Sequence, residues 1–252
     1  MHKTLVANWK MNLSIQESIN LAKQLAQDQD VASFKHTMVL CPSFPALIPV
    51  GQALANTKIA LGAQDMFWEE NGSYTGEVSA TTLKEVGCTH TIIGHSERRN
   101  IVGETNAMVH KKVMAAITAG ITPILCVGEK FQERQDGLKD HVIAEQVKSA
   151  LDGCDLSLVK KIIIAYEPVW VIGSGQAVEP QEAQYTSEVI HQVVTDLCVD
   201  ESVHSLTEVL YGGSVDADNI QSFLTQQDVD GVLVGGASLK LDSFSAMIQA
   251  TS

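Results

Sequence analysis

The amino-acid sequence predicts an α/β fold in which eight parallel strands close into a (β/α)8 barrel. Short runs of β-branched and apolar residues alternate with longer amphipathic segments, eight times at a spacing of about 30 residues. Buried parallel strands are apolar throughout because helices cover them. The length of 252 residues also suits such a barrel, for which about 250 residues is typical.

Eight apolar runs are the strand candidates. Each is bounded by polar residues or by glycine, as expected for a short buried strand. They cover residues 4–7, 37–40, 59–62, 89–93, 122–127, 161–165, 208–211 and 231–234.

Helical patterns separate these runs. Residues 14–27 form one predicted helix, with Ser14 and Glu17 as a capping box. We expect Ile15, Ile19, Ala22 and Leu25 on its inward face. A second helix is predicted over residues 105–119, with Val109, Val113 and Ala116 or Ile117 pointing inward and Gly120 ending it.

The chain is expected to form one domain over residues 1–252, because no linker or low-complexity segment divides it. A doubly wound nucleotide-binding sheet is the alternative α/β architecture. That fold requires G-x-G-x-x-G after the first strand, where this chain has Asn8-Trp9-Lys10-Met11. The barrel is therefore the better prediction.

Composition excludes several classes of protein. The net charge of −13 argues against nucleic-acid binding. No apolar run reaches membrane-spanning length, and the N-terminus lacks the apolar stretch of a signal peptide. The five cysteines are scattered without zinc or redox spacing, so we predict no metal, reduced thiols and a cytoplasmic location. Cys126 is expected to be a buried core residue.

A carboxylate follows the sixth predicted strand. The run Ile162-Ile163-Ile164 leads to Glu167, and a proline then stops the strand. An acid on a rigid strand, followed by a flexible apolar loop, suggests a catalytic base beneath a lid. An ordinary strand-to-helix connection would explain the proline and glycines but not an exposed apolar tip. The predicted lid consists of Pro168, Val169, Trp170, Val171, Ile172, Gly173, Ser174, Gly175 and Gln176.

Other reactive side chains also follow strands, where a barrel places its catalytic residues. Asn8 and Lys10 follow the first strand, and His95 and Glu97 follow the fourth. His95 precedes a predicted helix start, whose positive end disfavours imidazolium, so we expect a neutral ring that donates a hydrogen bond. Arg98 and Arg99 are expected to pair with Glu97 or Glu104.

Glycine pairs follow the last two strands. Gly212-Gly213-Ser214 and Gly235-Gly236 are expected to open helices, where free backbone N–H groups bind anions. Tight turns would explain either pair alone. Because a phosphate site after strands seven and eight is common in barrels, two adjacent pairs favour phosphate binding.

The residues resemble the triosephosphate isomerase family from the first strand to the last helix. The matching segments are ANWKMN (7–12), GHSERR (94–99), CVGE (126–129), AYEPVW (165–170), YGGSV (211–215) and LVGGASLK (233–240). The resemblance implies a TIM barrel that interconverts dihydroxyacetone phosphate and D-glyceraldehyde 3-phosphate, in glycolysis and gluconeogenesis, without a cofactor or metal.

The resemblance also implies roles for the site residues. Glu167 would move the proton, and His95 would hydrogen-bond the enediolate oxygens. Asn8 and Lys10 would steady the substrate, and Glu97 would support Lys10. The phosphate would be held by backbone N–H groups of Gly173, Ser214, Gly235 and Gly236, while Ile172 and Leu233 would close over the base.

The stretch from Ala63 to Val78 is the longest predicted segment without helix or strand, and it carries exposed apolar residues. From the residues alone, it either binds a partner or folds over its own barrel rim. By resemblance it is the loop of a symmetric homodimer, with Thr75 reaching the partner's site near Asn8 and His95.

The lid departs from the family pattern at two places. Gln176-Ala177-Val178 stands where Lys-Thr-Ala or a close variant is usual, and Val171 stands where alanine is common. These positions bear on lid motion rather than on the chemistry. Two other functions stay open at this point, namely a barrel enzyme for a larger phosphorylated substrate and a phosphate-binding protein without turnover.

Overall fold

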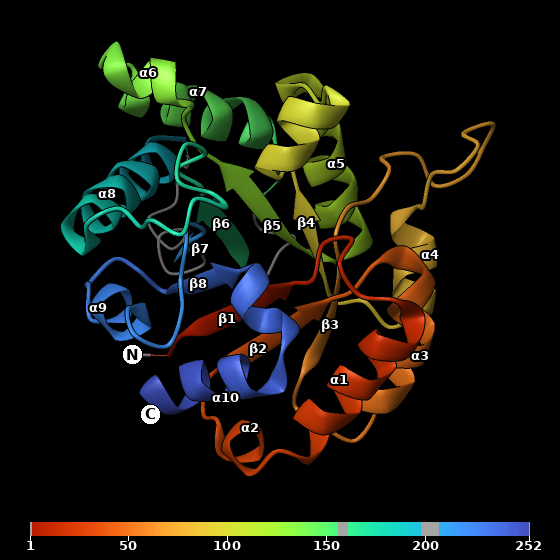
Figure 1. Cartoon of the computed structure of the whole chain (residues 1–252). Helices are drawn as coiled ribbons and strands as arrows, with labels where there is room; N and C mark the ends of the chain where they lie inside the picture. The colour runs from red at the N-terminus through yellow and green to blue at the C-terminus, as the bar shows by residue number, and fades with distance from the viewer. Residues whose placement is uncertain (1, 156–160, 198–206, 252) are drawn as a thin grey trace.

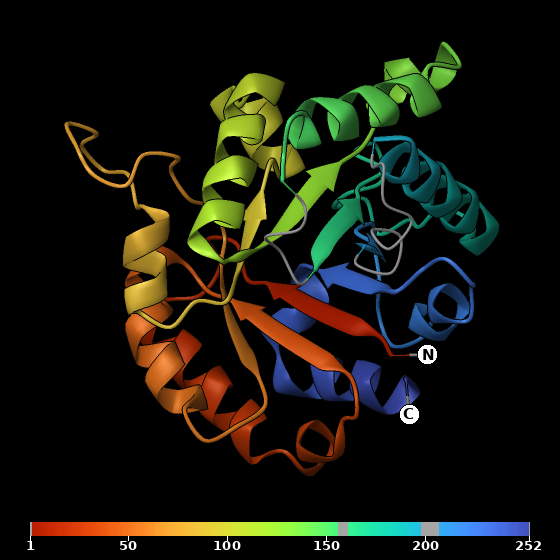
Figure 2. The ribbon, with the colours of Figure 1, turned by 180° about the vertical axis from the view of Figure 1, so that it is seen from behind.

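The computed structural model describes residues 2–155, 161–197 and 207–251. Eight parallel strands pair in chain order and close into a barrel, with β1 hydrogen-bonded to both β2 and β8. Helices surround the strands, and the two chain ends lie near each other in both views (Figures 1 and 2). The predicted (β/α)8 barrel is confirmed.

All the predicted strands are present. Two have the predicted bounds, and the others differ by one residue at one end or at both. The strands are β1 (Thr4–Asn8), β2 (Thr37–Cys41), β3 (Ala60–Ala63), β4 (His90–Ile93), β5 (Thr122–Val127), β6 (Ile162–Tyr166), β7 (Thr207–Tyr211) and β8 (Gly231–Val234).

The longer helices form the outer ring, and shorter helical turns fill several connections. The α-helices are α1 (Ile15–Gln27), α2 (Gln29–Ser33), α3 (Leu47–Leu54), α4 (Ala80–Glu85), α5 (Asn106–Ala119), α6 (Phe131–Gln135), α7 (Lys139–Leu151), α8 (Pro180–Leu197), α9 (Ile220–Leu224) and α10 (Leu241–Ala250). The turns are η1 (Phe44–Ala46), the π-helical η2 (Arg98–Val102) and η5 (Gly236–Leu239).

The core has two layers because successive strand residues point to opposite sides of the sheet. In β1, Leu5 and Ala7 pack outward against helices, whereas Val6 packs into the barrel. The inner layer is built from residues of several strands: Val6, Val39, Cys41, Ile92, Ile124, Cys126, Ile163, Ala165, Leu210 and Leu233. Cys126 is fully buried, as predicted.

The capping predictions are confirmed, but one helix face is not. Ser14 caps α1 in a reciprocal capping box with Glu17, and Gly120 ends α5 in the left-handed conformation. Ile15, however, is 48% exposed, and the buried face of α1 begins at Ser18. Because Ile15 lies in the first turn at the barrel rim, the helix presents it to solvent rather than to the strands.

The segment between β3 and α4 projects from the barrel (Figures 1 and 2). Phe67 stacks on Trp68 and contacts Tyr74, with ring centroids 4.0 and 4.7 Å apart. These aromatic contacts within the segment hold it together as it leaves the rim. Among the described helices, none combines the length and the apolar character needed to cross a bilayer.

Barrel closure predicts a strict size limit at Gly231. A Cβ atom there would lie 1.8 Å from the Thr4 carbonyl oxygen of the neighbouring strand. We expect Gly231→Ala to lower the free energy of unfolding by about 3 kcal/mol or more, since backbone must move to admit the methyl group.

Urea unfolding followed by circular dichroism measures this effect. Gly51→Ala, in helix α3, is the matched control, because its Cβ would lie 3.1 Å from a flexible Leu61 side chain and at an ordinary contact distance of 3.5 Å from the Val86 carbonyl oxygen. The control should change stability by less than about 1 kcal/mol. Equal effects of the two substitutions would contradict the argument from closure.

Candidate active site

A cleft of about 340 Å³ opens at the carboxyl ends of the strands. It collects residues from connections that are far apart in the sequence, as the closed barrel requires. Its walls include Asn8, Lys10, His95, Glu167, Ile172, Gly173, Ser214, Leu233, Gly235 and Gly236, together with Gly175, Gly212, Gly213, Val215, Asp216 and Ala237. The structure therefore brings these predicted residues to one place.

Glu167 is almost fully buried, with 2% of its surface exposed. Its Oε1 lies 3.0 Å from His95 Nε2. The Ser96 backbone N–H donates to Oε2 at 2.8 Å, and the Ser96 hydroxyl donates to Oε1 at 3.1 Å. Burial raises the pKa of Glu167, but the lowering by His95 and Ser96 together is larger. The carboxyl pKa of Glu167 therefore lies below the ordinary value.

His95 is oriented by hydrogen bonds at both ring nitrogens. The Glu97 backbone N–H donates to Nδ1 at 3.2 Å, which assigns the ring hydrogen of the neutral form to Nε2, facing Glu167. Burial lowers the pKa of His95, but the Glu167 carboxylate raises it above the ordinary value. The positive end of the following helix was expected to disfavour the charged form of His95. The His95 pKa is raised instead, because the contacting Glu167 carboxylate has the larger effect.

Lys10 approaches the cleft from a strained backbone. Its φ of 51° is left-handed, which is uncommon for a residue with a side chain. The Asn8 side chain accepts a hydrogen bond from its N–H at 3.0 Å, and Gln64 donates to its carbonyl at 2.8 Å. Lys10 Nζ lies 2.6 Å from Glu97 Oε1. Both local contacts fix the backbone that aims this cation at the cleft.

The glycine-rich loops let backbone approach the cleft closely. A Cβ at Gly235 would lie 3.4 Å from Lys10 Cε, so this loop borders the lysine. A Cβ at Gly213 would lie 2.1 Å from the Tyr211 hydroxyl, which only glycine avoids. The expected helix starts differ, because Gly236 begins only the short turn η5 and α9 starts at Ile220. Each loop must turn over the rim before its helix can begin.

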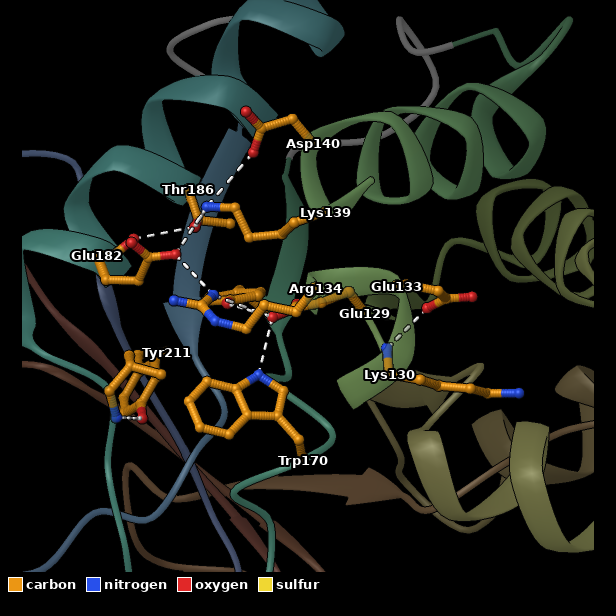
Figure 3. Close-up of polar contacts among 12 residues, drawn as sticks. Glu129, Lys130, Glu133, Arg134, Lys139, Asp140, Trp170, Glu182, Thr186 and Tyr211 are labelled. Atoms are coloured by element: carbon orange, nitrogen blue, oxygen red, sulfur yellow. Dashed lines mark hydrogen bonds and ion pairs between the residues drawn. The ribbon is translucent and has the colours of Figure 1, made fainter. Parts of the chain in front are cut away.

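The lid is held at both ends. Near its start, Trp170 Nε1 donates to Glu129 Oε1 at 2.9 Å (Figure 3). Just after its end, the Val178 N–H donates to the Tyr211 hydroxyl at 3.1 Å. The prediction of an exposed apolar tip is wrong for Val171, which is 1% exposed and packs into the core.

Sequence reasoning assigned no role to Ser96 or Glu129, although both lie in the segments that carry the resemblance. Their positions directly after His95 and after β5 were the available signals. The predicted arginine partners are half right. Arg98 contacts Glu104 at 3.4 Å and Asp65 at 2.9 Å, whereas Arg99 binds backbone carbonyls and Asn106.

Thr75 lies exposed on the projecting segment rather than in the wall of the cleft. Within the part of the chain that the structure describes, no group of three or more His, Cys, Asp or Glu side chains is arranged to hold a metal ion.

Comparison with known proteins agrees with this geometry. The triosephosphate isomerase family model matches residues 3–251. The chain belongs to the triosephosphate isomerase family. The isomerase prediction is thereby confirmed, and neither the larger-substrate enzyme nor the non-catalytic binding protein receives support.

Curated triosephosphate isomerases match nearly the whole chain. Those of Dictyoglomus thermophilum and Geotalea uraniireducens are 43% and 44% identical to it. The first match covers 98% of this chain and 99% of the relative, and the second covers 99% of both. The triosephosphate isomerase of Carboxydothermus hydrogenoformans is 41% identical over the full length of both chains.

The contact between His95 and Glu167 predicts a dependence of one pKa on the other side chain. In Glu167→Gln the carboxylate charge that raises the His95 pKa is absent, while burial of the ring, which lowers it, remains. We expect the His95 pKa to fall below its value in the unmodified protein.

Nitrogen chemical shifts of His95, followed by NMR across a pH titration, measure this change. His141 is exposed on α7 and serves as an internal reference, since its nitrogen chemical shifts should be the same in both proteins. An unchanged or higher His95 pKa in Glu167→Gln would show that the carboxylate is not the cause.

Proposed function

We propose that this chain interconverts dihydroxyacetone phosphate and D-glyceraldehyde 3-phosphate by moving one proton between neighbouring carbons. The observation that carries the proposal is the pairing of a buried carboxylate, Glu167, with His95 Nε2 at 3.0 Å in a cleft edged by glycine loops. A base and a hydrogen-bond donor are the two groups that enediolate formation requires.

In this mechanism Glu167 removes a proton from the carbon beside the carbonyl and returns it to the neighbouring carbon. His95 donates from Nε2 to the enediolate oxygens, and Asn8 and Lys10 stabilise the negative charge that develops there. Glu97 keeps Lys10 in position through their 2.6 Å contact. Because the substrate as a whole is neither oxidised nor reduced, we propose that the reaction needs no cofactor or metal.

The phosphate group is assigned to the glycine-rich side of the cleft. Backbone N–H groups of Gly173, Ser214, Gly235 and Gly236 would bind it, with Lys10 beside Gly235 supplying positive charge. Ile172 and Leu233 line the same cleft as Glu167 and would exclude water once the lid, Pro168 to Gln176, closes. The cleft volume of about 340 Å³ suits a small phosphorylated substrate.

We also propose that the working form is a homodimer built around the segment from Ala63 to Val78. Large apolar side chains are exposed in the connections that follow β1, β2, β3 and β4, on one side of the barrel rim. These are Met11, Ile15, Phe44, Ile48, Tyr74, Ile101 and Val102. A symmetric partner that covers this surface would bring Thr75 toward the neighbouring site.

A reducing compartment, the cytoplasm, is the proposed location. Cys41, Cys88 and Cys126 are buried free thiols, and Cys154 is a partly buried one. The fifth cysteine, Cys198, lies outside the described residues.

Shortening the proposed base tests the chemistry. Glu167→Asp keeps the charge but withdraws it by about 1.5 Å, one carbon–carbon bond, so kcat should fall by about a hundredfold or more. The affinity for inorganic phosphate should change little, since the phosphate loops are intact. A coupled assay with glyceraldehyde 3-phosphate measures the rate. Near-normal turnover would remove Glu167 from the role of base, and an inactive unmodified chain would favour a different phosphorylated substrate.

Placing a charge on the proposed dimer loop tests assembly. We expect the unmodified chain to sediment as a dimer and Thr75→Arg to sediment as a monomer with reduced activity, because a buried unpaired charge opposes association. Gln132→Arg, on exposed α6, is the control that should remain dimeric. If the unmodified chain and Thr75→Arg both run as monomers, the dimer proposal fails.

A further inference from the structure

Three charged side chains form a cluster beside the lid and outside the cleft (Figure 3). Arg134 lies on α6, Lys139 begins α7, and Glu182 lies in the first turn of α8. The lid lies between β6 and α8 in the chain, so Glu182 stands just beyond its far end. Arg134 contacts residues at both ends.

At the near end, Arg134 covers Trp170. Its guanidinium carbon lies 4.9 Å from the centre of the indole ring, within the range of a cation–π contact. Arg134 Nη1 also lies 3.4 Å from Glu129 Oε1, the same oxygen that accepts the Trp170 N–H. The arginine thus contacts both the ring and the carboxylate that orients it.

At the far end, Arg134 Nη1 lies 2.9 Å from Glu182 Oε1. Burial raises the pKa of Glu182, but hydrogen bonds from Lys139 and Arg134 lower it below the ordinary value, so this carboxylate stays ionised. Glu182 lies in the first turn of α8, which begins at Pro180, two residues after Val178. The Val178 N–H donates to the Tyr211 hydroxyl. The ion pair therefore holds the start of α8 against α6.

We propose that Arg134 is a positioning residue that couples the two ends of the lid through Trp170 and Glu182. A loop can close as one body when its two ends keep a fixed separation. The Arg134 guanidinium contacts Trp170 near one end and Glu182 beyond the other, and so holds these two residues at a fixed separation. The planar guanidinium can stack on an indole while it pairs with a carboxylate, which an ammonium group cannot do equally well. This inference rests on the proposed function for its kinetic readout and on the proposed phosphate site for its spectroscopic readout.

Arg134→Met tests the coupling, because methionine retains an apolar side chain against Trp170 and removes the charge. We expect kcat to fall about fivefold with a smaller change in KM, since closure follows binding and the lost contacts are of modest strength. Thermal melting checks that the variant is folded. Glu182→Gln removes the ion pair of Arg134 with Glu182 but leaves its contact with Trp170, and it should also lower kcat.

The double variant R134M/E182Q distinguishes coupling from two separate effects. If Arg134 acts through Glu182, the double variant should lose no more activity than Arg134→Met alone. Lys139→Met is the matched control, because Lys139 Nζ contacts the same Glu182 oxygen at 2.9 Å but binds Thr186 instead of the lid. Its kcat should stay within about twofold of the unmodified value.

A spectroscopic signal reports the lid independently of turnover. With 5-fluorotryptophan incorporated, the ¹⁹F resonance of Trp170 is assigned by its loss in Trp170→Phe. Inorganic phosphate should shift this resonance in the unmodified chain, and the shift should be about twofold smaller in Arg134→Met because fewer lids close.

Three results would overturn the proposal. These are a folded Arg134→Met with unchanged kcat and an unchanged phosphate response, additive losses in the double variant, or an equal loss of kcat in Lys139→Met. Failure of the proposed function is distinguishable, because the unmodified chain would then lack isomerase activity while the Trp170 signal still tests Arg134. If Arg134→Met does not fold, Glu182→Gln carries the same test.

Discussion

Closure of the parallel barrel is the constraint on which the site depends. Each strand is parallel to both neighbours, and β1 joins β8, so every strand delivers its carboxyl end to one rim. Asn8 at the end of β1 is thereby brought together with His95 and Glu167, which follow β4 and β6. Closure itself requires a residue without a side chain at position 231, since Gly231 packs directly against the backbone of Thr4.

The proposed anion site of this acidic chain depends on a few local groups. Its net charge is −13, yet the cleft receives Lys10 from a strained backbone, and glycine loops line the cleft, one of them at Gly235 beside Lys10. Glu167 is kept ionised there by donors on both oxygens, from Ser96 and His95. Because both oxygens are occupied, this carboxylate must exchange a partner before it can accept a proton from carbon. The contacts that lower the Glu167 pKa therefore also occupy the oxygens that the proposed proton transfer would use.

Much of this arrangement could be predicted from the sequence, because strand order and strand ends follow from apolar periodicity. The strands lie within one residue of their predicted bounds, and that accuracy sufficed to place the cleft residues. Tertiary contacts explain the failures. Ile15 faces solvent although it fits a helical stripe, and Val171 is buried although its loop was expected to be exposed. The raised His95 pKa depends on Glu167, whose distance from the ring cannot be inferred from sequence spacing.

Backbone hydrogen bonds explain how the lid tolerates unusual residues at its far end, Gln176-Ala177-Val178. Gly173 and Gly175 both adopt φ of 75°, so the tip turns where side chains are disfavoured. The Ser174 hydroxyl donates to the Val171 carbonyl at 2.7 Å and accepts from the Gln176 N–H at 3.1 Å. Val178, in turn, is bound to Tyr211 through its own N–H.

Gln176 and Val178 thus donate these hydrogen bonds from their backbone N–H groups, which any residue except proline can supply. Their side chains play different parts, since Gln176 is exposed and Val178 is buried in the core. A departure from the usual Lys-Thr-Ala pattern therefore leaves the hydrogen bonds of this end intact. Val178 packs in the hydrophobic core, where its side chain buries more apolar surface next to the lid than the usual alanine would.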